Sequence, residues 1–151
     1  MHEESVRVPM LLHWPRLKRR GVRIPALVSS LDLFPTLLDL AGAPVPEGLS
    51  GLSLAPALRG PVRPLRDYVA SECVCVGGAR GTGHRMVRTE RWKYILTGVN
   101  EELLFDEHAD PFERVNVAGA DANRAILQQM RGHMRDWMVR VGDTHLPPPD
   151  A

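Results

Sequence analysis

The feature that most constrains the fold of this chain lies at residues 102–117, which read ELLFDEHADPFERVNV. A short apolar run at residues 103–105 is followed by an acidic turn that contains a proline. Asp106, Asp110 and Asn116 carry side chains that accept backbone N–H bonds in turns and caps. The segment therefore predicts a short strand followed by a tight turn, which positions the helix that comes next in the sequence.

The residues on either side predict a small antiparallel sheet crossed by one helix. Strand-like runs occur at residues 68–76, 85–88, 92–96 and 103–105, with a tight turn at residues 89–91. A glycine-rich run at residues 77–83 lacks the spacing of a phosphate-binding loop and is predicted to be a flexible hairpin loop. A long helix is expected to begin near Asp121 or Asn123. Apolar residues share one of its faces at spacings of three and four, namely Ile126, Met130, Met134, Trp137 and Val141.

The first half of the chain predicts the end of an α/β domain. Residues 6–14 are apolar without alternation, which is typical of a strand buried on both faces. Residues 31–41 have apolar residues at helical spacing, with Asp32 as the expected N-cap and Gly42 as the stop. Residues 44–64 are rich in proline and glycine and predict a surface connection with a short helix at residues 54–59. The predicted fold class is α/β, with an α+β second half.

Composition excludes several functional classes. With a net charge of +1, the chain has no strong attraction for nucleic acid or acidic lipid. No run approaches the roughly 20 apolar residues that span a membrane. The acidic N-terminus is unlike a signal peptide, and the compartment stays unknown. Cys73 and Cys75 are expected to be small buried hydrophobic residues, because two thiols on one strand favour neither a disulfide nor a zinc site.

Taken in order, four blocks of the sequence resemble the C-terminal portion of sulfatases. Residues 3–15 read EESVRVPMLLHWP, residues 30–42 read SLDLFPTLLDLAG and residues 49–54 read LSGLSL. The fourth block joins WKY at residues 92–94 to the segment at 102–117. The resemblance implies an alkaline-phosphatase-like fold. Residues 1–64 would be the end of the large α/β domain, and residues 65–151 the C-terminal subdomain of a four-stranded antiparallel sheet with a C-terminal helix.

The residues that the family uses for catalysis are not found in this sequence. Sulfatases convert the Cys or Ser of a Cys/Ser-x-Pro-x-Arg motif to formylglycine and bind calcium through Asp-Asp and Asp-His or Asp-Asn pairs. None of these motifs occurs here. The resemblance implies that the last catalytic residues of the family precede residue 3. We therefore expect no catalytic residue, no metal ligand and no cofactor in this chain. Calcium and formylglycine belong to the complete enzyme, whose N-terminal domain would be a missing partner.

His84 and Arg85 are the candidate substrate-binding residues. They follow the glycine-rich loop, at an edge that in the family reaches the rim of the substrate pocket, where they could bind a sulfate or sugar group. The alternative for His84 is a surface histidine at the start of a hairpin. His2 is expected at a frayed end of the chain.

The function expected from the sequence is that of a C-terminal sulfatase segment, inactive alone, whose complete enzyme acts on a sulfate ester. Two alternatives stay open, namely a non-catalytic binding or structural module and a fragment of a related phosphodiesterase or phosphonate hydrolase.

Overall fold

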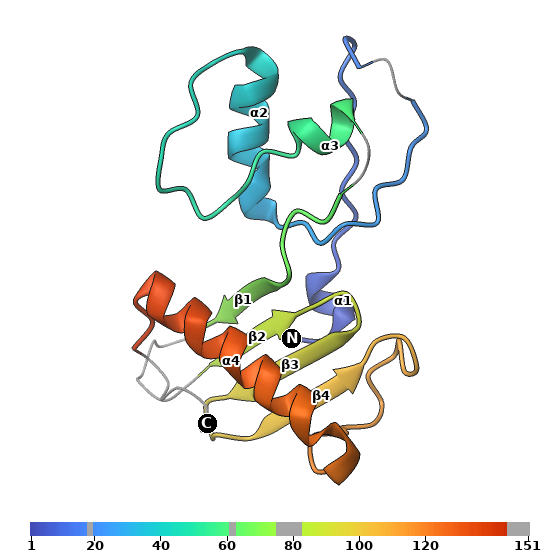
Figure 1. Ribbon diagram of the computed structural model, residues 1–151, viewed down its shortest axis with the longest axis vertical. Coiled ribbons are helices and arrows are strands. Elements are labelled where there is room, and N and C mark those ends of the chain that lie inside the picture. The colour runs from blue at the N-terminus through green and yellow to red at the C-terminus, as the bar shows by residue number, and fades with distance from the viewer. Residues whose placement is uncertain (18–19, 61–62, 75–82, 145–151) are drawn as a thin grey trace. The chain divides into compact units, whose positions relative to one another are not determined.

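The computed structural model describes residues 1–17, 20–60, 63–74 and 83–144 (Figure 1). The chain forms two compact units. Unit 1 combines Met1–Val8 with Tyr68–Ala151, and unit 2 is Pro9–Asp67. The resemblance places a domain boundary between residues 64 and 65. That boundary separates the two domains of the family, and it remains a prediction.

Unit 1 is built on a four-stranded antiparallel sheet in which each strand pairs with its neighbour in the sequence. The strands are β1 (Val69–Cys73), β2 (His84–Arg88), β3 (Trp92–Thr97) and β4 (Glu102–Asp106). The predicted turn between β2 and β3 is closed by Thr89, whose backbone N–H donates to the carbonyl of Trp92 at 2.9 Å. The predicted four-stranded sheet is thereby confirmed.

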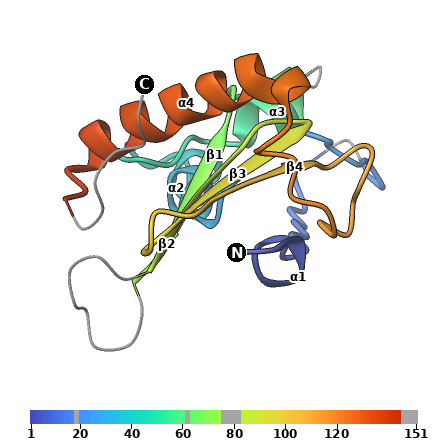
Figure 2. The same ribbon diagram turned by 90° about the horizontal axis from the view of Figure 1, so that it is seen from below.

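A helix covers each face of this sheet. The long helix α4 (Arg124–Val141), preceded by a 3₁₀ turn at Asp121–Asn123, lies along one face, and the single turn of α1 (Glu3–Val6) lies on the other (Figure 2). Strand side chains alternate between faces, so Tyr94 and Leu104 pack under α4 while Ile95 and Phe105 pack with Val6 of α1. The predicted C-terminal helix against the sheet is confirmed, and α1 adds a second layer.

Two details of unit 1 differ from expectation. Leu127 and Met138 are buried on α4 in place of Ile126 and Val141. Ile126 is only partly buried at the edge of the core, and Val141 is 43% exposed because it is the last residue of the helix. The side chain of Cys73 is exposed, because β1 is an edge strand that α4 covers only in part. Cys75, most of the glycine-rich loop and the C-terminal tail lie outside the described residues.

In its described residues, unit 2 has the helices α2 (Leu33–Ala41) and α3 (Ala55–Arg59), and a 3₁₀ turn at Ser30–Asp32 leads into α2. The strand expected at residues 6–14 is wrong, because no residue in the described part of unit 2 pairs as a strand. A strand must satisfy its N–H and C=O groups on a neighbouring strand, and unit 2 supplies no such neighbour among those residues. The apolar run is instead irregular.

Asp32 organises unit 2 through its carboxylate. Asp32 is the N-cap residue of α2 as expected, but its side chain makes no capping bond to that helix. It belongs instead to a capping box of the 3₁₀ turn, in which the backbone N–H of Ser29 donates to Asp32 at 2.7 Å. Asp32 also accepts from the backbone N–H of Leu52 at 2.8 Å and from Arg66 at 2.6 Å. This loop can approach because residue 51 is glycine, where a Cβ atom would meet the carbonyl oxygen of residue 31 at 2.0 Å.

The apolar side of α2 is largely uncovered within unit 2. Leu33, Phe34 and Leu37 are exposed, although their spacing predicts a buried stripe. Gly42 ends the helix as expected, in the left-handed conformation with φ 76°. The helix therefore forms as predicted, and its apolar side is free to contact another surface.

We predict that Met134→Ala lowers the free energy of unfolding by about 2–5 kcal/mol, because it opens a cavity in the core between α4 and the sheet. Val139→Ala is the matched control on the same helix, since Val139 is 84% exposed. It should change stability by less than about 0.5 kcal/mol. Urea unfolding followed by circular dichroism measures both, and equal losses would contradict the observed helix face.

Candidate functional site

His84 and Arg85 open β2 and are adjacent in sequence, so their side chains leave opposite faces of the sheet. Arg85 is fully buried and forms a two-bond ion pair with Asp143, just beyond the end of α4. The hydrogen bond with Asp143 raises the pKa of Arg85. His84 is half-buried, and its Nδ1 has no hydrogen-bond partner among the described residues. Arg85 is thus paired with Asp143, whereas His84 keeps a nitrogen that has no hydrogen-bond partner among the described residues.

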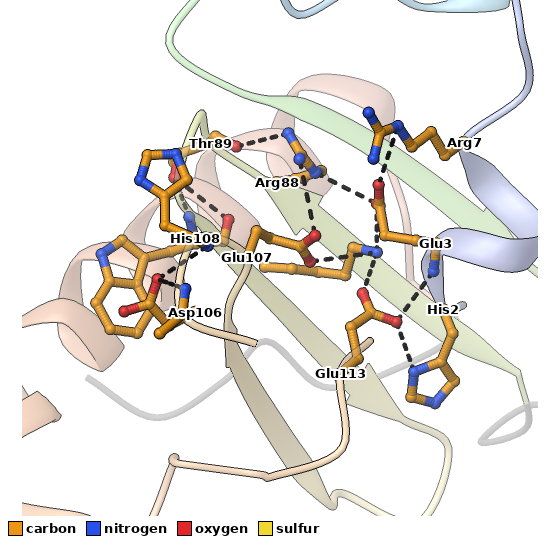
Figure 3. Close-up of polar contacts among 12 residues, drawn as sticks. His2, Glu3, Arg7, Arg88, Thr89, Asp106, Glu107, His108 and Glu113 are labelled. Atoms are coloured by element: carbon orange, nitrogen blue, oxygen red, sulfur yellow. Dashed lines mark hydrogen bonds and ion pairs between the residues drawn. The ribbon is translucent and has the colours of Figure 1, made fainter. Parts of the chain in front are cut away.

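The densest group of charged side chains surrounds Lys93, on the face of the sheet that α1 covers. Lys93 lies on β3 and is 0% exposed. Its Nζ donates to Glu3 Oε1 at 2.6 Å and to Glu113 Oε1, and it lies 3.5 Å from Glu107 Oε1. Arg88 lies beside it, with Nε 3.3 Å from Glu3 Oε1 and a terminal nitrogen 3.7 Å from Glu107 Oε2. Figure 3 shows Arg88, Glu3, Glu107 and Glu113 converging from separate segments. We call the group formed by Lys93, Arg88, Glu3, Glu107, Glu113 and His2 the Lys93 cluster.

His2 is an ordered member of this cluster, which corrects the expectation of a frayed end. Its Nδ1 lies 2.7 Å from Glu113 Oε2, and the same oxygen accepts the backbone N–H of Glu3 at 3.0 Å. The His2 ring also packs against Phe105, with ring centroids 5.5 Å apart. The start of the chain is therefore held on the sheet by polar and apolar contacts, which local sequence patterns do not reveal.

The turn after β4 delivers Glu107 and Glu113 to the cluster, and its polar residues act as predicted. Asp106 accepts the backbone N–H of residue 108 at 3.1 Å, and Asp110 accepts those of residues 114 and 115 at 2.6 and 2.8 Å. Asn116 accepts the N–H of residue 104 at 2.9 Å. These bonds fix the turn, so that Glu113 can sit in the uncommon left-handed conformation with φ 52°. The expected turn and cap roles are confirmed.

The two carboxyl groups on this turn are affected in opposite directions. Burial raises the pKa of Glu107 to about 7, and the adjacent carboxyl group of Glu113 adds to that shift. Burial also opposes ionisation of Glu113, but the hydrogen bond from Lys93 and the backbone N–H of Glu3 help to outweigh it, and the pKa of Glu113 is lowered. Glu113 is therefore the ionised partner of the lysine, and Glu107 is the group more easily protonated.

The cluster does not fit a calcium ion. Oxygen atoms of Glu3, Glu107 and Glu113 lie within 4.8 Å of one another, as the ligands of a cation would. The ammonium of Lys93 already contacts all three carboxyl groups and supplies the positive charge. A metal ion there would have to displace a buried lysine, so we derive no metal chemistry from this group.

Comparison with known proteins decides the family. A family model of the C-terminal region of N-sulphoglucosamine sulphohydrolase matches residues 1–140. The chain belongs to the sulfatase family. It is 38% identical over 149 residues to a Δ4,5-hexuronate-2-O-sulfatase of Bacteroides thetaiotaomicron, covering 95% of this chain and 31% of that protein. It is 41% identical to arylsulfatase K of Gallus gallus over 131 residues, covering 78% of this chain and 23% of that protein.

Solved structures agree with this assignment. A 2-O GAG sulfatase matches with a TM-score of 0.67 and 43% identity, covering 75% of this chain and 25% of that one. A phosphonate monoester hydrolase from Silicibacter pomeroyi matches with a TM-score of 0.59 and 29% identity, covering 72% and 24%. The sulfatase chain described here thus spans about a quarter to a third of the length of its relatives. Among the residues that the structure describes, no helix combines the length and hydropathy that crossing a membrane requires.

We predict that Lys93→Met lowers the free energy of unfolding by about 3–5 kcal/mol, because it leaves buried carboxylates without their cation. Arg124→Met is the matched control, since Arg124 forms an exposed ion pair with Asp121. It should cost about 0–1 kcal/mol. Thermal and urea unfolding compare the two variants, and similar losses would mean that the Lys93 cluster adds no more than a surface pair.

Proposed function

We propose that this chain is the C-terminal part of an enzyme that hydrolyses a sulfate ester, and that it has no such activity by itself. The family match over residues 1–140 carries the proposal. The missing Cys/Ser-x-Pro-x-Arg and Asp-Asp motifs support the second half of it, since sulfuryl transfer needs a nucleophile and stabilisation of developing charge. Formylglycine and calcium would supply that chemistry from residues outside this sequence.

In the complete enzyme this chain would have a supporting role. In the family pattern, the last catalytic residues precede the block that begins at Glu3. The Lys93 cluster holds that block on the sheet of unit 1 through Glu3 and His2, so unit 1 would fix the chain that leaves the active site. The exposed apolar side of α2 supports a second contact, because burying Leu33, Phe34 and Leu37 against the large domain would remove them from water.

Complementation tests the proposal. The hexuronate sulfatase relative, expressed without its own C-terminal region, should be inactive toward its sulfated substrate, and adding this chain should restore turnover. This chain alone should release no sulfate from an aryl sulfate. Turnover by the chain alone that persists with chelator and in the Cys73→Ala/Cys75→Ala variant would overturn the proposal. A cooperative thermal transition combined with failure to complement would favour a non-catalytic module.

The similarity to a phosphonate monoester hydrolase supports a second candidate, in which the complete enzyme cleaves a phosphonate ester. A hybrid of this chain with the N-terminal part of that hydrolase discriminates between the two. Restored turnover of a phosphonate ester, without restoration of sulfatase activity in the first hybrid, would favour this alternative.

We further propose that His84 contacts the sulfate or sugar group of the substrate, with Arg85 fixing the strand beside it through Asp143. His84 is only half-buried, and its buried Nδ1 has no hydrogen-bond partner among the described residues, so the ring is not committed to an internal hydrogen bond there and its exposed part would meet the substrate. In the complemented enzyme, His84→Ala should lower kcat/KM by about 10- to 150-fold, since a hydrogen bond to a charged group contributes about 1.5–3 kcal/mol. His133→Ala, a histidine on α4 that stacks on Tyr68, should leave kcat/KM unchanged. Equal kinetics for wild type and His84→Ala would remove His84 from the site.

A further inference from the structure

The charges of the Lys93 cluster do not balance. Lys93 and Arg88 bring two positive charges, whereas Glu3, Glu107 and Glu113 bring three negative ones. The side chains of these carboxylates are 12%, 4% and 1% exposed, so water screens them poorly. A net buried charge is costly, and a titratable group normally binds or releases a proton to avoid it. The cluster therefore needs one more positive charge.

The neighbouring cations do not supply it fully. Arg7 lies 3.8 Å from Glu3 but is 77% exposed, so solvent screens its charge. His2 contacts Glu113 and would balance the cluster only when protonated, and its side chain is itself about half exposed. The charge must otherwise be cancelled by a proton on one of the three carboxyl groups.

Glu107 is the carboxyl group best placed to take this proton. Glu3 and Glu113 each accept a direct hydrogen bond from Lys93. Glu107 Oε1 is buried with no hydrogen-bond partner among the described residues, and its other oxygen is 3.7 Å from Arg88. Its charge is therefore the least compensated of the three.

We propose that Glu107 carries a proton while α1 lies on the sheet, and that this proton keeps the start of the chain attached to the sheet. We call this protonated contact the latch. The groups that face Glu107 are Arg88 from β2, Lys93 from β3, Glu3 from α1 and Glu113 from its own turn. Loss of the proton places a third negative charge beside Glu3. The α1 turn has no fully buried residue, so it is the element that can leave.

The direction of the pH dependence follows from the pKa of Glu107, which is raised from 4.5 to about 7. The charge of Glu3 on α1 contributes to this shift, so the protonated Glu107 stabilises attachment and that contribution is lost as the pH rises through about 7. Glu113 acts in the opposite sense, because its pKa is lowered and its contribution is lost in acid. Attachment should therefore be strongest in mild acid and should weaken in mild alkali.

Hydrogen exchange of the 151-residue chain tests the latch. The backbone N–H groups of residues 5, 6 and 7 are bonded within the α1 turn and report its opening. Protection of the peptide covering residues 1–8, corrected for intrinsic exchange, should fall by up to tenfold per pH unit above about pH 7. In Glu107→Gln, which mimics the protonated side chain, protection should stay at the wild-type acidic level throughout.

Glu101→Gln is the control, because Glu101 is exposed on the neighbouring turn and outside the cluster. It should keep the wild-type pH dependence. Protection that is constant with pH in the wild type would overturn the proposal. So would a pH dependence that survives in Glu107→Gln and disappears in His2→Gln. If Glu107→Gln fails to fold, carboxyl ¹³C titration of the wild type decides, since the absence of a glutamate with a midpoint near pH 7 refutes the latch.

Discussion

The ammonium of Lys93 is the interaction on which unit 1 depends, because it joins three segments that are far apart in sequence. It contacts Glu3 from α1, and Glu107 and Glu113 from the turn after β4. A buried lysine without these partners would be strongly destabilising, and so would the carboxylates without the lysine. The parts of the cluster therefore stabilise one another only when β3, β4 and the start of the chain are all in place.

Around this cluster the sheet is buried on both faces in two different ways. Apolar packing dominates on the α4 side, where Met130 and Met134 meet Tyr94 and Leu104. Ion pairs secure α4 as well, with Arg131 donating two bonds to Glu102 at 2.7 and 2.6 Å and Arg85 pairing with Asp143 beyond the helix end. The α1 side has only a small apolar cluster and relies on charge. The α1 side therefore depends on the charge state of its carboxyl groups more than the α4 side, where apolar packing dominates.

Local patterns predicted elements well and tertiary partners poorly. The strand-like runs on either side of the turn at residues 89–91 were enough to predict β2, β3 and the turn that joins them. The helical spacing at residues 31–41 predicted α2 and its stop at Gly42. The strand at residues 6–14 was wrong, because a strand depends on a neighbour that no local pattern can guarantee. The roles of His2 and Glu113 were missed for the same reason, since their contact joins positions 111 residues apart.

By itself, the sequence determined the family, the four-stranded antiparallel sheet, the C-terminal helix and the absence of the family's catalytic motifs. These depend on residue order and on periodicities that are local to the chain. Only the tertiary structure decided that Lys93 is buried among three carboxyl groups, that Arg85 is committed to Asp143 and that His2 is held on the sheet. The physical reason is that buried charge is tolerated only beside a partner, and folding alone brings such partners together. The segment at residues 102–117 shows both cases. Its turn could be predicted from the sequence, whereas its contact with the buried Lys93 could not.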